Sequence, residues 1–357
     1  MTHIQKHFYI VLIGLFFLPF NSGCGKSDLS VSDYDITCYT ATYSEGVYRS
    51  DNGGTSWYPL DIDQEDLYLY FKKLFIHPEK NELYVATTGA GLFIIDLENE
   101  TLNDVIQFSD ESIRSIAFKS GLAGRESDVE IFAGMNSRGI FITQPGSGIW
   151  QALNKGLAYR DVNTFLVLSK DLYAGTVNDL YKWDEASKNW KASSEGIKNK
   201  NIISMNADPK GDILYAGSGT YQDEKGFFEN IPCLYKSADK GHTWEVSDRG
   251  LPDDTLVYVF AVNPQSPERI YIGTSDGIYR SVNSGKKWNR MKHGLPDESR
   301  VFDIKIARTP DGKDVVYAAG SKGIYMAMDE KSPQWEDKSY GLPQTSITSI
   351  ILGFSPN

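Results

Sequence analysis

Two pairs of carboxylates stand at matching places in the sequence and are the first candidates for chemistry. Asp253 and Asp254 follow one Gly-Leu-Pro triplet, and Asp297 and Glu298 follow the next. Two carboxyl groups roughly 5–10 Å apart can hydrolyse a glycosidic bond, one as the acid and the other as the base or nucleophile. The pairs would suit a glycosidase if the fold brought them together. A repeated turn is a simpler explanation of their identical positions.

The sequence shows no other constellation of catalytic residues. No Gly-rich phosphate loop leads from a strand into a helix, and no Ser/His/Asp spacing is typical of a hydrolase. The five histidines lack the spacing of metal ligands. We therefore expect no metal ion and no cofactor. The histidines are His3, His7, His77, His242 and His293.

The elements that must position any site come from an internal repeat. One unit recurs seven times: a strand resembling LYAGT, a Gly turn, a strand resembling IYRS, a polar turn and a closing large residue. The closing residues are 40 to 54 apart, and the strands alternate with a period of two. The pattern predicts an all-β fold, a seven-bladed β-propeller of four-stranded blades. The closing residues are Trp57, Leu102, Trp150, Trp190, Trp244, Trp288 and Trp335.

The register of the repeat predicts how the ring closes. A further apolar strand follows each Gly-Leu turn and precedes LYAGT, so it is the first strand of a blade. The chain ends with such a strand at 346–355, whereas the first blade begins at its second strand, near Cys38. We expect the C-terminal strand to complete blade 1, because closure removes exposed sheet edges.

Three turns between the third and fourth strands match Ser-x-Asx-x-Gly-x-x-Trp, the Asp-box pattern. An Asx side chain accepts backbone N–H groups, glycine allows positive φ, and tryptophan packs between blades. A metal-binding or acid role is the alternative, but Asn would be a poor acid. We interpret these residues as structural. They are Ser50, Asn52, Gly54 and Trp57; Ser237, Asp239, Gly241 and Trp244; and Ser281, Asn283, Gly285 and Trp288.

On these motifs, the chain resembles the Asp-box (BNR-repeat) propeller superfamily over nearly all of its expected mature length. That group includes sialidases, xyloglucanase-type glycoside hydrolases, sortilin-type receptors and photosystem II assembly factors. The resemblance implies the fold and a ligand face opposite the Asp-box turns, near the central channel. It does not imply one activity. The Arg-Ile-Pro signature and the six blades of sialidases are absent, and xyloglucanases place their cleft between two propellers.

One irregular loop marks that expected ligand face. In an antiparallel blade, the 2→3 and 4→1 loops share a face, and most of them are minimal here. Blade 5 instead carries an insertion at 219–232 that is rich in aromatic and acidic residues. Binding is often grafted onto such loops, although the insertion could equally be a lid over the channel. The candidate binding residues are Tyr221, Asp223, Phe227, Phe228 and Glu229.

The N-terminus resembles a bacterial lipoprotein leader. A short polar start precedes the apolar run Phe8–Phe20, which is too short to span a bilayer comfortably, and small residues precede Cys24. We expect a signal peptide at 1–23 and lipidation at Cys24. Asn21 departs from the usual leucine of the motif, which leaves simple cleavage to a periplasmic or secreted chain as the alternative.

After the leader we expect a short linker at 24–37 and one propeller at 38–357. The remaining cysteines, Cys38 and Cys233, fall in blades 1 and 5, on distant sides of the ring. A disulfide needs Cα atoms within about 7 Å, so we expect both to be free and buried.

Charge and organisation together predict a function class. The net charge is −11 and no long basic run occurs, which disfavours nucleic-acid binding. We predict an exported, lipid-anchored, non-catalytic scaffold of the cell envelope that binds a protein or polysaccharide on the face opposite the Asp-boxes. We expect a monomer that meets the membrane only through its lipid. The alternative is a xyloglucanase-like glycoside hydrolase acting on β-glucans, with a sialidase less favoured.

Overall fold

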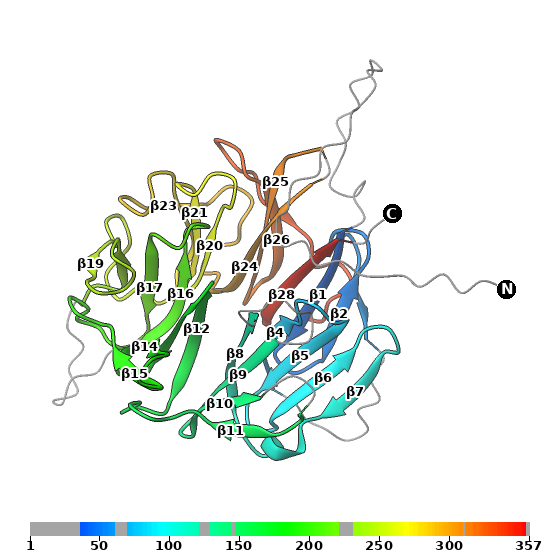
Figure 1. Cartoon of the computed structure of the whole chain (residues 1–357). Coiled ribbons are helices and arrows are strands. Elements are labelled where there is room, and N and C mark those ends of the chain that lie inside the picture. The colour runs from blue at the N-terminus through cyan, green and yellow to red at the C-terminus, as the bar shows by residue number, and fades with distance from the viewer. Residues whose placement is uncertain are drawn as a thin grey trace, which may run out of the picture.

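The structure is a computed structural model that describes residues 36–60, 70–120, 129–143, 147–220, 231–309 and 311–354. In this part of the chain, seven four-stranded antiparallel sheets stand side by side in a ring (Figure 1). The only helix described is one turn of 3-10 helix, η2 (Ile106–Phe108). The prediction of an all-β seven-bladed propeller is confirmed.

In each blade the four strands follow one another from the channel outward. Blade 1 contains β28 (Ile347–Phe354), β1 (Ile36–Thr42), β2 (Val47–Ser50) and β3 (Tyr58–Pro59); blade 2 contains β4 (Phe71–Ile76), β5 (Glu82–Thr87), β6 (Leu92–Asp96) and β7 (Thr101–Asp104). Blade 3 contains β8 (Ile113–Ser120), β9 (Val129–Met135), β10 (Gly139–Thr143) and β11 (Trp150–Ala152); blade 4 contains β12 (Val162–Leu168), β13 (Asp171–Thr176), β14 (Leu180–Asp184) and β15 (Asn189–Ala192). Blade 5 contains β16 (Ile202–Ala207), β17 (Leu214–Ser218), β18 (Leu234–Ser237) and β19 (Glu245–Val246); blade 6 contains β20 (Val257–Val262), β21 (Ile270–Thr274), β22 (Gly277–Ser281) and β23 (Asn289–Arg290). Blade 7 contains β24 (Val301–Arg308), β25 (Asp314–Gly320), β26 (Gly323–Met328) and β27 (Glu336–Asp337).

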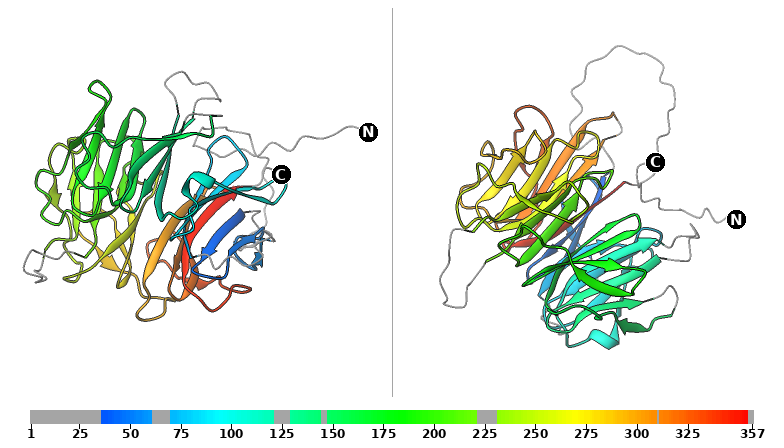
Figure 2. Two further views of the ribbon diagram at one scale, coloured as in Figure 1. Left: turned by 90° about the horizontal axis from the view of Figure 1, so that it is seen from below. Right: turned by 60° about the vertical axis from the view of Figure 1, so that its left-hand side comes forward.

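The last strand closes the ring by completing the first blade. β28 pairs antiparallel with β1, from Ile36 opposite Phe354 to Thr42 opposite Ile347. Figure 2 shows the red C-terminal strand beside the blue N-terminal strand. The predicted closure is therefore confirmed, and β1 begins at Ile36, two residues before the expected start at Cys38.

Neighbouring blades pack through the repeated aromatic and glycine residues. The indole N–H of Trp288 donates to the carbonyl of Ser247 in the preceding blade, at 2.7 Å. Trp57, Trp190 and Trp244 donate in the same way. The glycine of the LYAGT strand allows a close approach, because a Cβ at Gly273 would lie 2.6 Å from the carbonyl oxygen of Val301. The repeated Trp and Gly residues of the sequence pattern are therefore those that form the contacts between blades.

The three Ser-Asx-Gly turns use their polar groups internally. In the blade 5 turn, Ser237 Oγ donates to Asp239 Oδ1 at 2.7 Å and accepts from the N–H of Gly241 at 2.9 Å. Asp239 also accepts from the backbone and hydroxyl of Thr243. These bonds, with Thr243 contributing most, hold the pKa of Asp239 well below its usual range. The turns at Ser50 and Ser281 have the same Ser-to-Asx and Gly-to-Ser bonds.

Both described cysteines are buried and free. Cys38 is on β1 and Cys233 is next to β18, and each is inside the hydrophobic packing between blades. Burial raises the pKa of both thiols, to about 12 for Cys233. The expectation of two free, buried cysteines is confirmed.

Candidate functional site

The innermost strands begin with the same irregularity in all seven blades. Each shows a register shift against the second strand, which leaves one extra residue near the start of the inner strand. Figure 1 shows these strands gathered around the axis of the ring. We call the seven extra residues the mouth ring: Lys72, Arg114, Asn163, Ile203, Tyr258, Phe302 and Thr348.

The mouth ring lies on the face that carries the 2→3 turns. The backbone of Ser275, in such a turn, donates to the carbonyl of Leu256, one residue before β20. The backbone of Ser321 likewise donates to the carbonyl of Arg300, directly before β24. We call this the loop face, and the face that carries the Ser-Asx-Gly turns the turn face.

Side chains of neighbouring blades meet in the mouth ring. Arg114 Nη1 donates to Asn163 Oδ1 at 2.6 Å, and Asn163 Nδ2 donates to Asn201 Oδ1 at 3.2 Å. On the other side of the channel, the rings of Tyr258 and Phe302 lie 5.4 Å apart. The mouth therefore has a polar side and an aromatic side.

An exposed aromatic pair lies beside this ring. The rings of Tyr43 and Tyr70 are 5.1 Å apart, and the two residues are 51% and 46% exposed. The carbonyl of Tyr43 accepts from the N–H of Phe71, so the pair adjoins Lys72 at the edge between blades 1 and 2. Exposed tyrosine rings can stack on sugars or anchor a protein partner.

One tier below the mouth ring, a buried carboxylate is held by two blades. Asp303 on β24 is fully buried and accepts from Lys305 Nζ at 2.7 Å, from Ser349 Oγ at 2.8 Å and from the backbone of Ile350 at 3.1 Å. Burial opposes its charge, but Lys305, Lys73 and the hydrogen bonds together lower the pKa of Asp303. The side chain stays ionised and joins blade 7 to the closing strand.

The predicted catalytic carboxylates lie on two exposed turns of the loop face. Asp253, Asp254, Asp297 and Glu298 are all exposed, and none makes a hydrogen bond or ion pair within the described part of the chain. Asp254 and Glu298 have φ values of 60° and 53°, so they occupy the same left-handed position of a repeated turn. Asp297 lines a shallow pocket between blades 6 and 7.

The candidate binding residues Tyr221, Asp223, Phe227, Phe228 and Glu229 lie outside the described residues, as does Cys24. The first two residues of the insertion, Gly219 and Thr220, are described. Asn199 Nδ2 donates to the carbonyl of Gly219 at 2.9 Å, and Asn201 Nδ2 donates to the carbonyl of Thr220 at 2.7 Å. Because Asn201 also contacts the mouth ring, the insertion begins beside the channel mouth.

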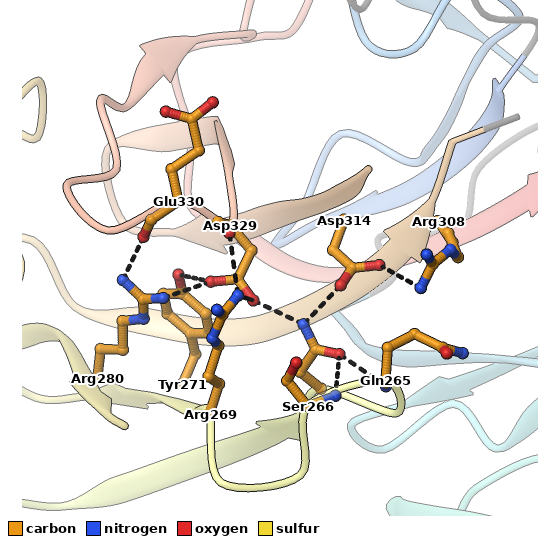
Figure 3. Close-up of polar contacts among 10 residues, drawn as sticks. Gln265, Ser266, Arg269, Tyr271, Arg280, Arg308, Asp314, Asp329 and Glu330 are labelled. Carbon is orange, nitrogen blue, oxygen red and sulfur yellow. Dashed lines mark hydrogen bonds and ion pairs between the residues drawn. The ribbon is translucent and has the colours of Figure 1, made fainter. Parts of the chain in front are cut away.

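A second polar cluster lies on the turn face between blades 6 and 7 (Figure 3). Asp329 accepts from Arg280 at 2.7 Å and from Tyr271 at 2.9 Å through Oδ1, and from Asn263 at 2.6 Å through Oδ2. Asn263 also donates to Asp314 at 2.9 Å. Since Asp329 is saturated by donors of the same chain, we interpret this cluster as a clasp between blades.

Among the described residues, no group of three or more His, Cys, Asp or Glu side chains is placed to hold a metal ion. In the same ranges, no helix is both long and apolar enough to cross a membrane.

The chain matches no family model and no curated protein. It does match solved propellers. An ancestral GH74 enzyme aligns with a TM-score of 0.67 and 18% identity over 87% of this chain and 45% of that chain. The GH74 xyloglucanase from Xanthomonas campestris aligns with a TM-score of 0.62 and 16% identity over 87% of this chain and 54% of the enzyme.

A third match is the extracellular domain of a proposed one component system from B. thetaiotaomicron. It aligns with a TM-score of 0.57 and 13% identity over 87% of this chain and 48% of that chain. This chain therefore spans about half the length of these structures. At such identities the similarity shows the propeller fold alone.

Sequence reasoning missed the residues that gather at the mouth. Each of these residues lies in a short strand or loop with no distinctive local sequence pattern. They are Lys72, Arg114, Tyr43 and Tyr70. One signal was available, because two adjacent lysines interrupt the apolar run of β4. The bulge at the start of this inner strand brings Lys72 to the channel mouth.

Proposed function

We propose that this chain is an exported, lipid-anchored, non-catalytic β-propeller that binds a protein or polysaccharide partner on its loop face. The observation that carries the proposal is the channel mouth, where the exposed pair Tyr43 and Tyr70 adjoins Lys72. The leader at 1–23, followed by Cys24, supports export and anchoring. The extracellular propeller from B. thetaiotaomicron supports an external location.

The exposure and the hydrogen-bond partners of the carboxylates favour a binding function over hydrolysis. A glycosidase needs one carboxyl group that donates a proton and a second one facing it. Asp253, Asp254, Asp297 and Glu298 are exposed turn residues. The Asp239 carboxylate accepts several hydrogen bonds within its turn, and the Asp329 carboxylate accepts from Arg280, Tyr271 and Asn263. The fully buried Asp303 is paired with Lys305.

A β-glucan hydrolase is the second candidate, and the similarity to GH74 enzymes is the observation that favours it. In that case the insertion at 219–232 would supply a wall of the cleft. The four exposed carboxylates of the loop face would be the first residues to test.

The experiment that decides between the two measures turnover and binding on the same preparation. The purified chain is incubated with xyloglucan and other β-glucans while reducing ends are measured. In parallel, its retention on immobilised polysaccharides and its partners from an envelope extract are recorded, with a variant lacking 221–230 as the comparison. Binding without turnover is expected. Turnover that disappears in a D253N/D254N/D297N/E298Q variant would establish the hydrolase instead.

A further inference from the structure

The inner strands carry a charge opposite to that of the whole chain. The chain has a net charge of −11, yet β4, β8 and β24 contribute six basic residues and one acidic residue, and the other inner strands contribute none. A cationic lining in an acidic protein focuses anions toward the channel. The residues are Lys72, Lys73, Arg114, Lys119, Lys305 and Arg308, with Asp303 opposing them.

Two of these cations have no internal partner at the mouth. Lys305 pairs with Asp303, Arg308 pairs with Asp314, and Arg114 lies 3.7 Å from Asp161. Lys72 and Lys73 form no ion pair within the described residues. Lys72 is exposed, and Lys73 is half-buried with its ammonium over the ring of Phe75. These two lysines are available to a ligand.

The two lysines are partly desolvated and lie near other cations. Desolvation and the nearby Arg114 lower the pKa of Lys72. Desolvation, and then the charges of Lys305 and Lys72, lower the pKa of Lys73 against the opposing effect of Asp303. An anion bound at these ammonium groups would offset the cost of their desolvation and the effect of the nearby positive charges.

The neighbouring groups indicate what kind of anion would fit. Tyr43 and Tyr70 offer two exposed rings next to the start of β4, the strand that carries Lys72. Around the mouth, the Thr348 hydroxyl and the Asn163 and Asn201 amides are engaged with neighbouring groups of the chain, and their oxygens keep further lone pairs that can accept. Rings, amides and ammonium groups together suit a sugar that carries a carboxylate. A long polyanion would meet the overall negative charge of the protein.

We propose that the channel mouth between blades 1, 2 and 3 binds a carboxylate-bearing oligosaccharide. Lys72 and Lys73 hold the carboxylate, and Tyr43 and Tyr70 stack against the sugar ring. The inference rests on the proposed function as a binding scaffold and names the chemical class of its ligand. An acidic peptide is the competing ligand, and the test below separates the two.

The test uses the full purified chain and matched probes. Binding of hexagalacturonate, its neutral methyl ester and hexaglutamate is measured by calorimetry at two salt concentrations. We expect hexagalacturonate to bind in a salt-dependent manner and about tenfold more tightly than the ester. K72Q/K73Q should weaken the binding of hexagalacturonate by about tenfold or more, and K72Q alone should weaken it less. Y43A/Y70A should weaken the binding of both sugar probes.

The control variant is K286Q/K287Q, which removes two adjacent exposed lysines from the turn face and so matches the change in net charge. It should bind hexagalacturonate like the wild type. The inference is overturned if hexagalacturonate does not bind or if its methyl ester binds equally well. It is also overturned if K72Q/K73Q keeps both the wild-type melting temperature and full affinity for hexagalacturonate. Equal binding of hexaglutamate, together with unchanged binding by Y43A/Y70A, would overturn it in favour of an acidic peptide. Hydrolysis of any probe would overturn the scaffold function itself.

Discussion

Asp329 of blade 7 and Arg280 of blade 6 form a buried ion pair, with 2.7 Å between Oδ1 and Nη2 and side chains that are 0% and 5% exposed. In three other seams, the second-strand tyrosine donates to a backbone carbonyl in the turn of the next blade. Here Tyr271 donates to the Asp329 carboxylate instead. Ala327 occupies the position that serine has in the Ser-Asx-Gly turns. Asp329 therefore has no serine hydroxyl to bind within its own turn, and its carboxylate binds Arg280 and Tyr271 of blade 6 instead.

Replacing Asp329 by alanine should be strongly destabilising. Arg280 would keep its burial and lose its carboxylate, and removing one partner of a buried ion pair typically costs about 3–5 kcal/mol. Denaturant unfolding of D329A measures this loss. The comparison is D253A, which removes an exposed carboxylate without a partner and should change stability by less than about 0.5 kcal/mol. Equal stability of the two variants would show that the clasp is dispensable.

Removing residues 345–357 should lower the melting temperature by about 10 °C or more, or prevent folding, because β1 would lose its inner partner. Asp303 would also lose the hydroxyl of Ser349 and the N–H of Ile350. S349A removes one of these bonds and should cost only about 1–2 kcal/mol. Calorimetric melting compares the three proteins, and an unchanged melt of the truncated chain would argue against closure by β28.

His77 should make stability depend on pH in a defined window. Burial, and then Lys80, lower the pKa of His77 to about 4, whereas an unfolded histidine titrates near 6.5. Between these values the unfolded chain binds a proton that the folded chain does not. Stability should therefore fall as pH falls from about 6.5 to about 4, by roughly 2–3 kcal/mol.

The matched variant for this window is H77N. His77 Nδ1 accepts from the N–H groups of Glu79 and Lys80, and Asn263 accepts in the same way from Gln265 and Ser266 in blade 6. Asparagine should thus keep the turn and remove the titration. Denaturant midpoints at pH 7, 5.5 and 4 should fall less for H77N than for the wild type. Parallel pH profiles would contradict the assignment.

The glycine of the LYAGT strand should not tolerate alanine. In G217A, the new methyl group would lie 2.8 Å from the carbonyl oxygen of Val257 and 2.4 Å from Ser204 Oγ. Relieving this overlap must separate blades 5 and 6, which costs about 1–3 kcal/mol. Thermal melting measures the loss, and G353A serves as the control, because a Cβ at Gly353 would meet only the carbonyl oxygen of Thr37 at an ordinary 3.6 Å and Gly353 has no positive φ. A G217A protein as stable as the wild type would show that the blades can separate freely.

The sequence by itself determined the number of blades, the strand order and the closing strand, because each blade repeats the same local pattern. The Trp, Gly and Ser-Asx-Gly positions could be read one blade at a time. Sequence reasoning also recognised that Asp253 and Asp297 fill equivalent turn positions. These features depend on residues close together in the chain, so the alternation of apolar side chains and the turn chemistry were sufficient.

Only the tertiary structure decided what gathers at the channel. Lys72, Arg114 and Asn163 are one blade apart in sequence, and a bulge repeated in every inner strand brings them to one rim. The pairing of Arg280 with Asp329 crosses a seam in the same way. The physical reason is that closure of the ring brings together side chains from different blades. These residues are far apart in the sequence, so their contacts cannot be read from local residue spacing.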